Sequence, residues 1–174
     1  RCNEILKKLT LNPSIEDKFI DKNLNLYDHV KEIVNSFKEI SNKNFEIDIE
    51  QNSNPFHIKK SIEIVYGIRN FVGNANKFCN NNVFIAIKSD SEKTEIIIED
   101  DGPGFPKDIL SKIGEPYIKS LSTKNNSKSG LGLGIFIGKT LLEKNKAKII
   151  FRNSETRGGA EIKIEWSNKN LLNI

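Results

Sequence analysis

The chain has 174 residues, of which 37% are hydrophobic and 29% are charged. This composition predicts one domain with a packed core and excludes a disordered chain. The formal net charge of +4 is a mild excess, and no stretch approaches the roughly 20 apolar residues that a membrane span needs. No signal-peptide pattern is present, and Cys2 and Cys79 do not form a disulfide framework. Met is absent even from position 1, which indicates a piece of a longer protein.

The first third of the chain is expected to contain helices and one strand. Residues 1–9 are typical of the last turns of a helix, and the charged run after Pro13 is typical of a linker. Apolar residues at helical spacing predict an amphipathic helix over about 26–40, and their alternation with charged residues predicts a strand over 45–49.

The rest of the chain is expected to alternate between helices and strands. A helix is predicted over about 61–79, and the three Asn residues at 80–82 are predicted to stop it in the left-handed conformation. The remaining predicted segments are strands at 83–89 and 94–99, a mobile polar loop at 114–129, a helix at 132–144, and hairpin strands at 147–153 and 160–166. The apolar run at 96–98 predicts a strand buried on both faces. This order predicts a two-layer α/β sandwich, in which about three helices cover one face of a mixed, mostly antiparallel sheet.

The helix predicted over 61–79 carries a polar stripe opposite its apolar one. Asn70, Asn74 and Lys77 are spaced at i, i+4 and i+7, so they share one face. Two Asn residues one turn apart cost helix stability, which favours a ligand-binding role. An amide oxygen suits Mg²⁺ and a Lys suits phosphate. An ordinary solvated face is the alternative explanation of the same pattern.

Two glycine-rich segments follow. Asp100 comes at the end of a predicted strand and precedes Gly102 and Gly104, which allow a tight turn close to a flat ligand. Its carboxylate can accept a hydrogen bond from an exocyclic amine such as that of adenine, although a plain turn explains the same residues. The segment 130–134, Gly-Leu-Gly-Leu-Gly, opens a predicted helix, whose first N–H groups form an anion site. It lacks the spacing of a P-loop or a Rossmann loop.

Together and in this order, the three segments resemble the catalytic, ATP-binding domain of sensor histidine kinases, in the superfamily that also contains gyrase, MutL and the Hsp-type chaperone ATPases. Residues 70–78 match the N box, 100–104 match the first glycine box and 130–134 match the second, while 114–117 lie where the F box belongs. The match covers residues 26–166. The resemblance implies a Bergerat-type ATP-binding fold, with ATP and Mg²⁺ as its ligands.

Carried over to matching positions, the resemblance implies a role for each site residue. The catalytic set would be Asn74, which coordinates Mg²⁺, Asn70, which supports the phosphate and metal site, and Lys77, which contacts phosphate. The base pocket would consist of Asp100, which binds the adenine amino group, together with Phe78, Gly102 and Gly104. Residues 114–129 would form a lid from which Tyr117 and Lys119 or Lys124 reach the nucleotide, and phosphates would be held by Gly130, Leu131, Gly132, Leu133 and Gly134.

Position 70 predicts the kind of reaction. Relatives that hydrolyse ATP carry a Glu there as a general base, whereas Asn70 cannot accept a proton. A kinase needs positioning and charge stabilisation instead of water activation, because the acceptor histidine is already a nucleophile. Neither His29 nor His57 is followed by the acidic residue expected after an acceptor histidine, so the acceptor is expected to lie outside the chain.

The resemblance is strongest to the RegB/PrrB-type redox-responsive kinases. Arg1-Cys2, Gly114 to Tyr117, the run from Gly130 to Ile137, Ala160 and Trp166 carry it. It implies that Cys2 is a redox switch, although an inert helix cysteine is equally compatible with the sequence.

The resemblance also implies an organisation for the chain and its parent protein. Residues 1–12 would end a dimerisation and phosphoacceptor hairpin, 13–25 would be a linker, 26–167 the catalytic domain and 168–174 a tail. The full-length protein would be a homodimeric bacterial inner-membrane sensor whose cytoplasmic part includes this chain, and its partners would be its own acceptor domain and a response regulator. The isolated chain would be monomeric.

Three alternatives stay open at the level of sequence. They are an anti-sigma-type serine kinase, a nucleotide-sensing module of the same fold without transfer activity, and a binder of phosphate-rich polymers. The dispersed basic residues argue against the last of these and against nucleic acid as a partner.

Overall fold

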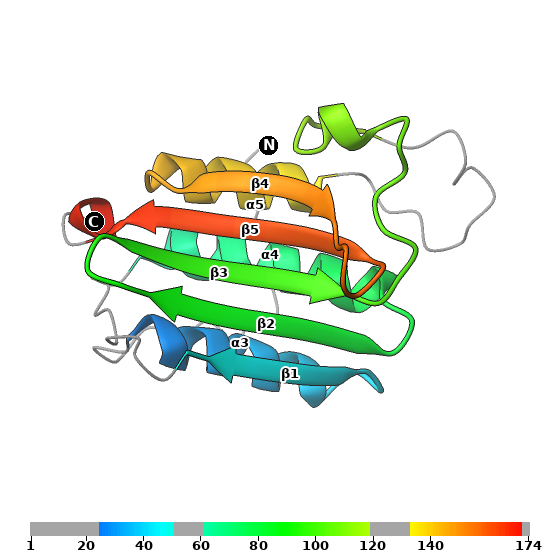
Figure 1. The fold of residues 1–174 in the computed structure, drawn as a ribbon, viewed down its shortest axis with the longest axis horizontal. Coiled ribbons are helices and arrows are strands. Elements are labelled where there is room, and N and C mark those ends of the chain that lie inside the picture. Colours follow the sequence, from blue (N-terminus) through cyan, green and yellow to red (C-terminus); the bar gives the residue numbers. More distant parts are fainter. Residues whose placement is uncertain (1–24, 51–60, 119–132, 172–174) are drawn as a thin grey trace, which may run out of the picture.

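A computed structural model describes residues 25–50, 61–118 and 133–171. Its elements are α3 (Leu26–Lys38), β1 (Asn44–Ile49), α4 (Ile62–Phe78), β2 (Asn82–Ser89), β3 (Lys93–Asp100), the 3-10 turn η1 (Leu110–Lys112), α5 (Gly134–Lys144), β4 (Lys148–Asn153), β5 (Ala160–Ser167) and α6 (Asn168–Leu171). The five strands form one sheet in the order β1-β2-β3-β5-β4, in which only β1 and β2 pair in parallel. Helices α3, α4 and α5 cover one face (Figure 1). The predicted α/β sandwich is therefore confirmed.

Local sequence signals explain where α3 and α4 begin. The Asn25 side chain accepts a hydrogen bond from the Asp28 N–H at 2.9 Å, and the Ser61 hydroxyl accepts one from the Ile64 N–H at 3.3 Å. Each cap satisfies a backbone donor that has no partner within its own helix. The structure corrects the predicted left-handed stop after α4, because Cys79 leaves the helix in an extended conformation with φ −58° and ψ 154°.

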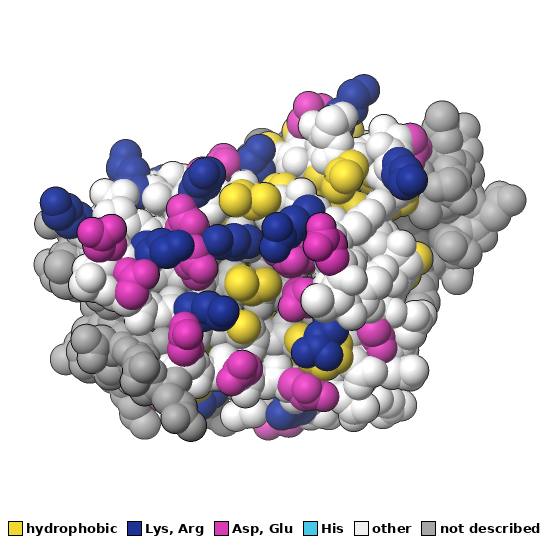
Figure 2. Space-filling model, viewed as in Figure 1, with side chains coloured by type: hydrophobic (Ala, Val, Ile, Leu, Met, Phe, Trp, Pro, Cys, Tyr) yellow, Lys and Arg dark blue, Asp and Glu magenta, His cyan; other side chains and the backbone are white. Residues whose placement is uncertain are grey.

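The core lies between the sheet and its helical cover. Alternate residues of the central strands, such as Ile96 and Ile98 of β3, are fully buried against the helices, and Trp166 of β5 is buried with them. Ile97 points to the other face and is only half-buried, which corrects the prediction of a strand buried on both faces. That open face is coated with Lys, Arg, Asp and Glu side chains around a few apolar ones (Figure 2).

Helices α4 and α5 pack closely because glycines lie at their contact. A Cβ atom on Gly67 would meet the Leu142 side chain at 2.5 Å, and one on Gly138 would meet the Phe71 ring at 2.7 Å. These distances are too short for any larger residue, so the glycines set the separation of the two helices. The start of α5 is thereby held next to the polar face of α4.

The last described segment also belongs to the packed domain. Residues 168–171, expected to belong to a tail, form α6, in which Asn168 and Leu171 are buried. Asn168 accepts a hydrogen bond from the Thr94 hydroxyl and donates one to the Asp90 carbonyl, both at 2.8 Å. No helix within the described residues is long and apolar enough to cross a membrane.

Candidate functional site

The predicted polar face of α4 is present, and Asn70 on this face lies next to the start of α5. Asn70 and Asn74 are half-buried and Lys77 is exposed. Asn70 donates a hydrogen bond from Nδ2 to the Tyr66 carbonyl at 2.8 Å, so the amide oxygen points away from its own helix. A Cβ atom built on Gly134 would lie 3.8 Å from that oxygen. The Asn74 side chain makes no hydrogen bond within the described part of the chain, which leaves its amide available to a ligand.

Asp100, the last residue of β3, is only 2% exposed and is held by backbone donors. Its Oδ1 accepts hydrogen bonds from the N–H groups of Gly102 at 2.8 Å and Ala160 at 3.2 Å. Burial raises the pKa of this carboxyl, and the two backbone hydrogen bonds partly offset that effect. Its Oδ2 makes no hydrogen bond within the described residues, so one acceptor stays free for an amine.

The predicted glycines bring Asp100 against the end of α4. A Cβ atom on Gly102 would lie 2.3 Å from the Phe78 carbonyl oxygen, so only glycine allows this close approach. Gly104 has a φ of +75°, a left-handed conformation that favours glycine. The glycine loop, residues 100–105, therefore connects the strand end to the helix that carries the polar face.

Asp101 fixes the same junction, and sequence reasoning did not single it out. Its carboxylate accepts hydrogen bonds from the backbone N–H groups of Asn80, Asn81 and Asn82 at 2.8 to 3.1 Å. These contacts stabilise the extended exit from α4, which explains why no left-handed stop is needed. An Asp followed by Gly-Pro-Gly was readable as turn chemistry, but the partners about 20 residues upstream were not.

The start of α5 presents open backbone donors beside the polar face of α4. Leu133 occupies the N-cap position and makes no side-chain hydrogen bond to the helix, and Gly134 is exposed. The first N–H groups of this helix are therefore uncapped by any described side chain, and the helix dipole adds partial positive charge there. An anion is the natural partner of such a helix end.

Two other predicted contacts have a specific geometry. The Phe78 side chain is 36% exposed at the end of α4, and the Lys77 ammonium lies 5.3 Å from the centre of its ring. Tyr117 has a φ of 61° and is 71% exposed, with no described contact to Asp100 or to the α4 polar face. The predicted residues Cys2, Lys119, Lys124, Gly130, Leu131 and Gly132 lie outside the described residues.

The described part of the site combines one buried acceptor, free amide oxygens and an uncapped helix end. Residues 25–50, 61–118 and 133–171 contain no cluster of three or more His, Cys, Asp or Glu side chains that could hold a metal. The amide oxygens of Asn70 and Asn74 are of the kind that hard cations accept as ligands. The arrangement suits an amine-bearing, phosphate-bearing ligand such as a nucleotide.

Comparison with known proteins identifies the family of this chain. Residues 59–170 match the profile of the histidine kinase-, DNA gyrase B-, and HSP90-like ATPases. The chain belongs to this family.

Among named proteins, the chain is similar to sensor histidine kinases. It is 32% identical over 119 residues to the sensor histidine kinase RegB of Cereibacter sphaeroides, an alignment that covers 60% of this chain and 26% of RegB. It is 37% identical over 79 residues to the sensor protein kinase PilS of Pseudomonas aeruginosa, covering 44% of this chain and 14% of PilS. The chain thus spans about a quarter or less of the length of these relatives.

Solved structures show the same fold. The mycobacterial sensor histidine kinase MprB superimposes with a TM-score of 0.67 at 19% identity and covers 85% of this chain and 97% of its own. The catalytic domain of histidine kinase ThkA superimposes with a TM-score of 0.68 at 22% identity and covers 83% and 95%.

Proposed function

We propose that this chain is the ATP-binding catalytic domain of a two-component sensor histidine kinase. The observation that carries the proposal is the position of the free Asp100 carboxylate oxygen, on a loop packed against the end of α4, whose polar face meets the uncapped start of α5. One helix thus links a base-recognition group to a phosphate-binding group.

The residues fit Mg-ATP in their chemistry. The free Oδ2 of Asp100 matches the amino group of adenine, and the exposed Phe78 ring offers a flat surface for the base. Asn74 and Asn70 would offer amide oxygens to Mg²⁺. The exposed Lys77 ammonium would contact phosphate. The backbone N–H groups of Leu133 and Gly134 would donate hydrogen bonds to phosphate oxygens.

These residues support transfer of the γ-phosphoryl group rather than hydrolysis. In the transfer, a nitrogen lone pair of the acceptor imidazole forms a bond to the γ-phosphorus, the bond from that phosphorus to the β,γ-bridging oxygen breaks, and ADP leaves with the electron pair. Asn70 holds no proton-accepting group, so it orients ligands and leaves water unactivated.

The wider setting extends the same proposal. The acceptor would be a histidine on a dimerisation domain of the same protein, and a response regulator would receive the phosphoryl group on an aspartate. The parent protein would be a membrane-bound homodimer with this domain in the cytoplasm, and Cys2 would act as a redox switch in it. These statements rest on the similarity to sensor histidine kinases and on the sequence match near Arg1.

Calorimetric ATP titrations with and without Mg²⁺ test the site. Asp100→Asn should weaken ATP binding at least about tenfold, because an amide in place of the carboxylate removes a charge-assisted hydrogen bond. Asn74→Ala should mainly remove the gain in affinity that Mg²⁺ gives. Matched controls are Asp90→Asn, which alters the turn at the other end of β3, and Asn76→Ala, whose amide accepts from Ser41 away from the polar face.

Unchanged ATP affinity in both site variants would overturn the assignment. ATP binding without phosphorylation of a supplied acceptor domain would instead favour a nucleotide-sensing module.

A further inference from the structure

Asn153, the last residue of the edge strand β4, contacts the glycine loop. Its Oδ1 accepts a hydrogen bond from the Phe105 N–H at 2.6 Å, and its Nδ2 donates one to the Phe105 carbonyl at 3.0 Å. The side-chain amide therefore pairs with both backbone groups of one residue, as a neighbouring strand would. The contact joins residues 48 positions apart in the sequence.

The residue that pairs with Asn153 in the sheet holds the other end of the glycine loop. Asn153 lies opposite Ala160 in the pairing of β4 with β5, and the Ala160 N–H donates to Asp100 Oδ1. Asp100 and Phe105 are the two ends of the glycine loop, so a single pair of residues anchors both. A Cβ atom on Gly104 would lie 2.7 Å from Asn153 Oδ1, which shows how closely the amide fits under the loop.

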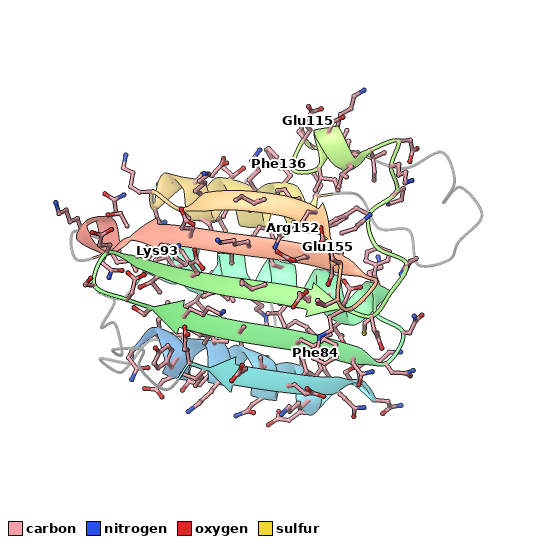
Figure 3. The ribbon with its side chains drawn as sticks, viewed as in Figure 1. Phe84, Lys93, Glu115, Phe136, Arg152 and Glu155 are labelled. Atoms are coloured by element: carbon pink, nitrogen blue, oxygen red, sulfur yellow. The ribbon has the colours of Figure 1, made fainter. Side chains whose placement is uncertain are left out.

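The hairpin between β4 and β5 is itself fixed to the sheet. The Ser154 hydroxyl donates to Glu99 Oε1 at 2.6 Å, and the Arg157 guanidinium lies 3.9 Å from the centre of the Phe84 ring. Figure 3 shows Arg152 and Glu155 at this hairpin, at the end of the sheet where β3 also terminates, with Phe84 on β2. Asn153 therefore lies next to a hairpin that these two contacts fix to the sheet.

We infer that Asn153 is a positioning residue of the nucleotide site, one that sets the glycine loop and with it the Asp100 carboxylate. It would act through the backbone of Phe105 and would not touch the nucleotide. This inference rests on the proposed function. Without the amide, the Phe105 N–H and carbonyl lose their partners and Gly104 gains room, so the loop samples conformations that do not present Asp100 to the base.

ATP dissociation constants with and without Mg²⁺ test the inference on the whole chain. Asn153→Ala should weaken ATP binding about tenfold, in line with the loss of two hydrogen bonds that order the loop. The loss should be equal with and without Mg²⁺, because Asn153 acts on the base side of the site and not on the metal side. Asn153→Asp keeps the shape but places an oxygen without a proton against the Phe105 carbonyl, so it should also weaken binding.

Asn168→Ala is the matched control. Like Asn153, Asn168 has a side-chain amide that accepts one hydrogen bond and donates one, but it is more deeply buried and lies at the opposite end of β3. It should lower the urea midpoint as Asn153→Ala does and change ATP affinity less than twofold. All titrations are done where urea unfolding shows each variant to be folded.

The outcomes separate the two claims. If the wild-type chain binds no ATP, the proposed function fails and this inference fails with it. If the wild type binds ATP and Asn153→Ala binds it equally well, or no worse than Asn168→Ala, only the inference is overturned. A loss confined to titrations that contain Mg²⁺ would also overturn it, because that would place Asn153 on the metal side.

Discussion

Glu95 lies among lysines on the open face of β3. Its Oε1 lies 2.7 Å from the Lys163 ammonium and 2.8 Å from that of Lys93, and its side chain is 10% exposed. Burial opposes ionisation, but the hydrogen bonds from Lys163 and Lys93 prevail and lower the pKa of Glu95 to about 2. A carboxyl with a lowered pKa stabilises the fold above its unfolded pKa, and this contribution disappears as pH falls through its folded pKa.

We therefore expect Glu95→Gln to reduce the free energy of unfolding by about 1 to 2 kcal/mol at pH 7. The difference from the wild type should shrink as pH falls from 4.5 to about 2. Urea unfolding across this range measures it. Glu46→Gln is the control, since Glu46 lies on the same open face and makes no ion pair with a described residue. A difference that persists below pH 2 would show that packing, not ionisation, is responsible.

The contribution of Asp100, on the same strand, to stability should change with pH in the opposite direction. Burial raises the pKa of its carboxyl, so the folded state holds the proton more tightly than the unfolded state does. Its contribution to stability is present below the unfolded pKa and is lost as pH rises through the folded pKa. We expect Asp100→Asn to become more stable relative to the wild type between acidic and neutral pH, as followed by thermal unfolding. A constant difference across that range would contradict the raised pKa.

The close contact of α4 with α5 leads us to predict how a substitution at Gly138 changes stability. Alanine has a helix propensity about 1 kcal/mol better than glycine, so Gly138→Ala should stabilise an isolated α5. In the protein its Cβ would meet the Phe71 ring at 2.7 Å and the Gly67 carbonyl oxygen at 3.1 Å. We expect a net destabilisation of about 1 to 3 kcal/mol in urea unfolding. Gly134→Ala is the stability control, because the nearest contact of its Cβ among the described residues would be Asn70 Oδ1 at 3.8 Å. Equal effects of the two substitutions would exclude the contact as the cause.

Individual elements also show which structural features can be predicted from nearby residues alone. The starts of α3 and α4 were predictable because Asn25 and Ser61 cap the helix within three residues of themselves. The end of α4 was predicted to within one residue, but the conformation of the chain there was not, since the donors at 80–82 are satisfied by Asp101 from another segment. Ile97 was placed in the core from its apolar neighbours, and only the uncovered face of the sheet explains its exposure.

The whole domain should bind ATP and hydrolyse it slowly. Asn70 cannot activate water, and no carboxylate of a described residue is hydrogen-bonded to its amide. We expect turnover by the isolated chain to be at least about a hundredfold below the ~10 s⁻¹ typical of enzymes. A coupled assay for ADP release measures it, with the Asp100→Asn variant as the background. Turnover near the typical value would contradict a phosphotransferase assignment.

The sequence by itself determined the fold class and named the segments of the candidate site. The spacing of apolar residues shows which face of each helix or strand is buried, and this spacing can be read directly from the sequence. The segments at 70–78, 100–104 and 130–134 can also be recognised from the sequence, because each contains its own chemically distinctive residues. Only the tertiary structure decided how those segments are held. Asp101, Asn153 and the Ala160 N–H act on partners 19 to 60 residues away, and no local pattern encodes a hydrogen bond that exists only once the sheet has formed.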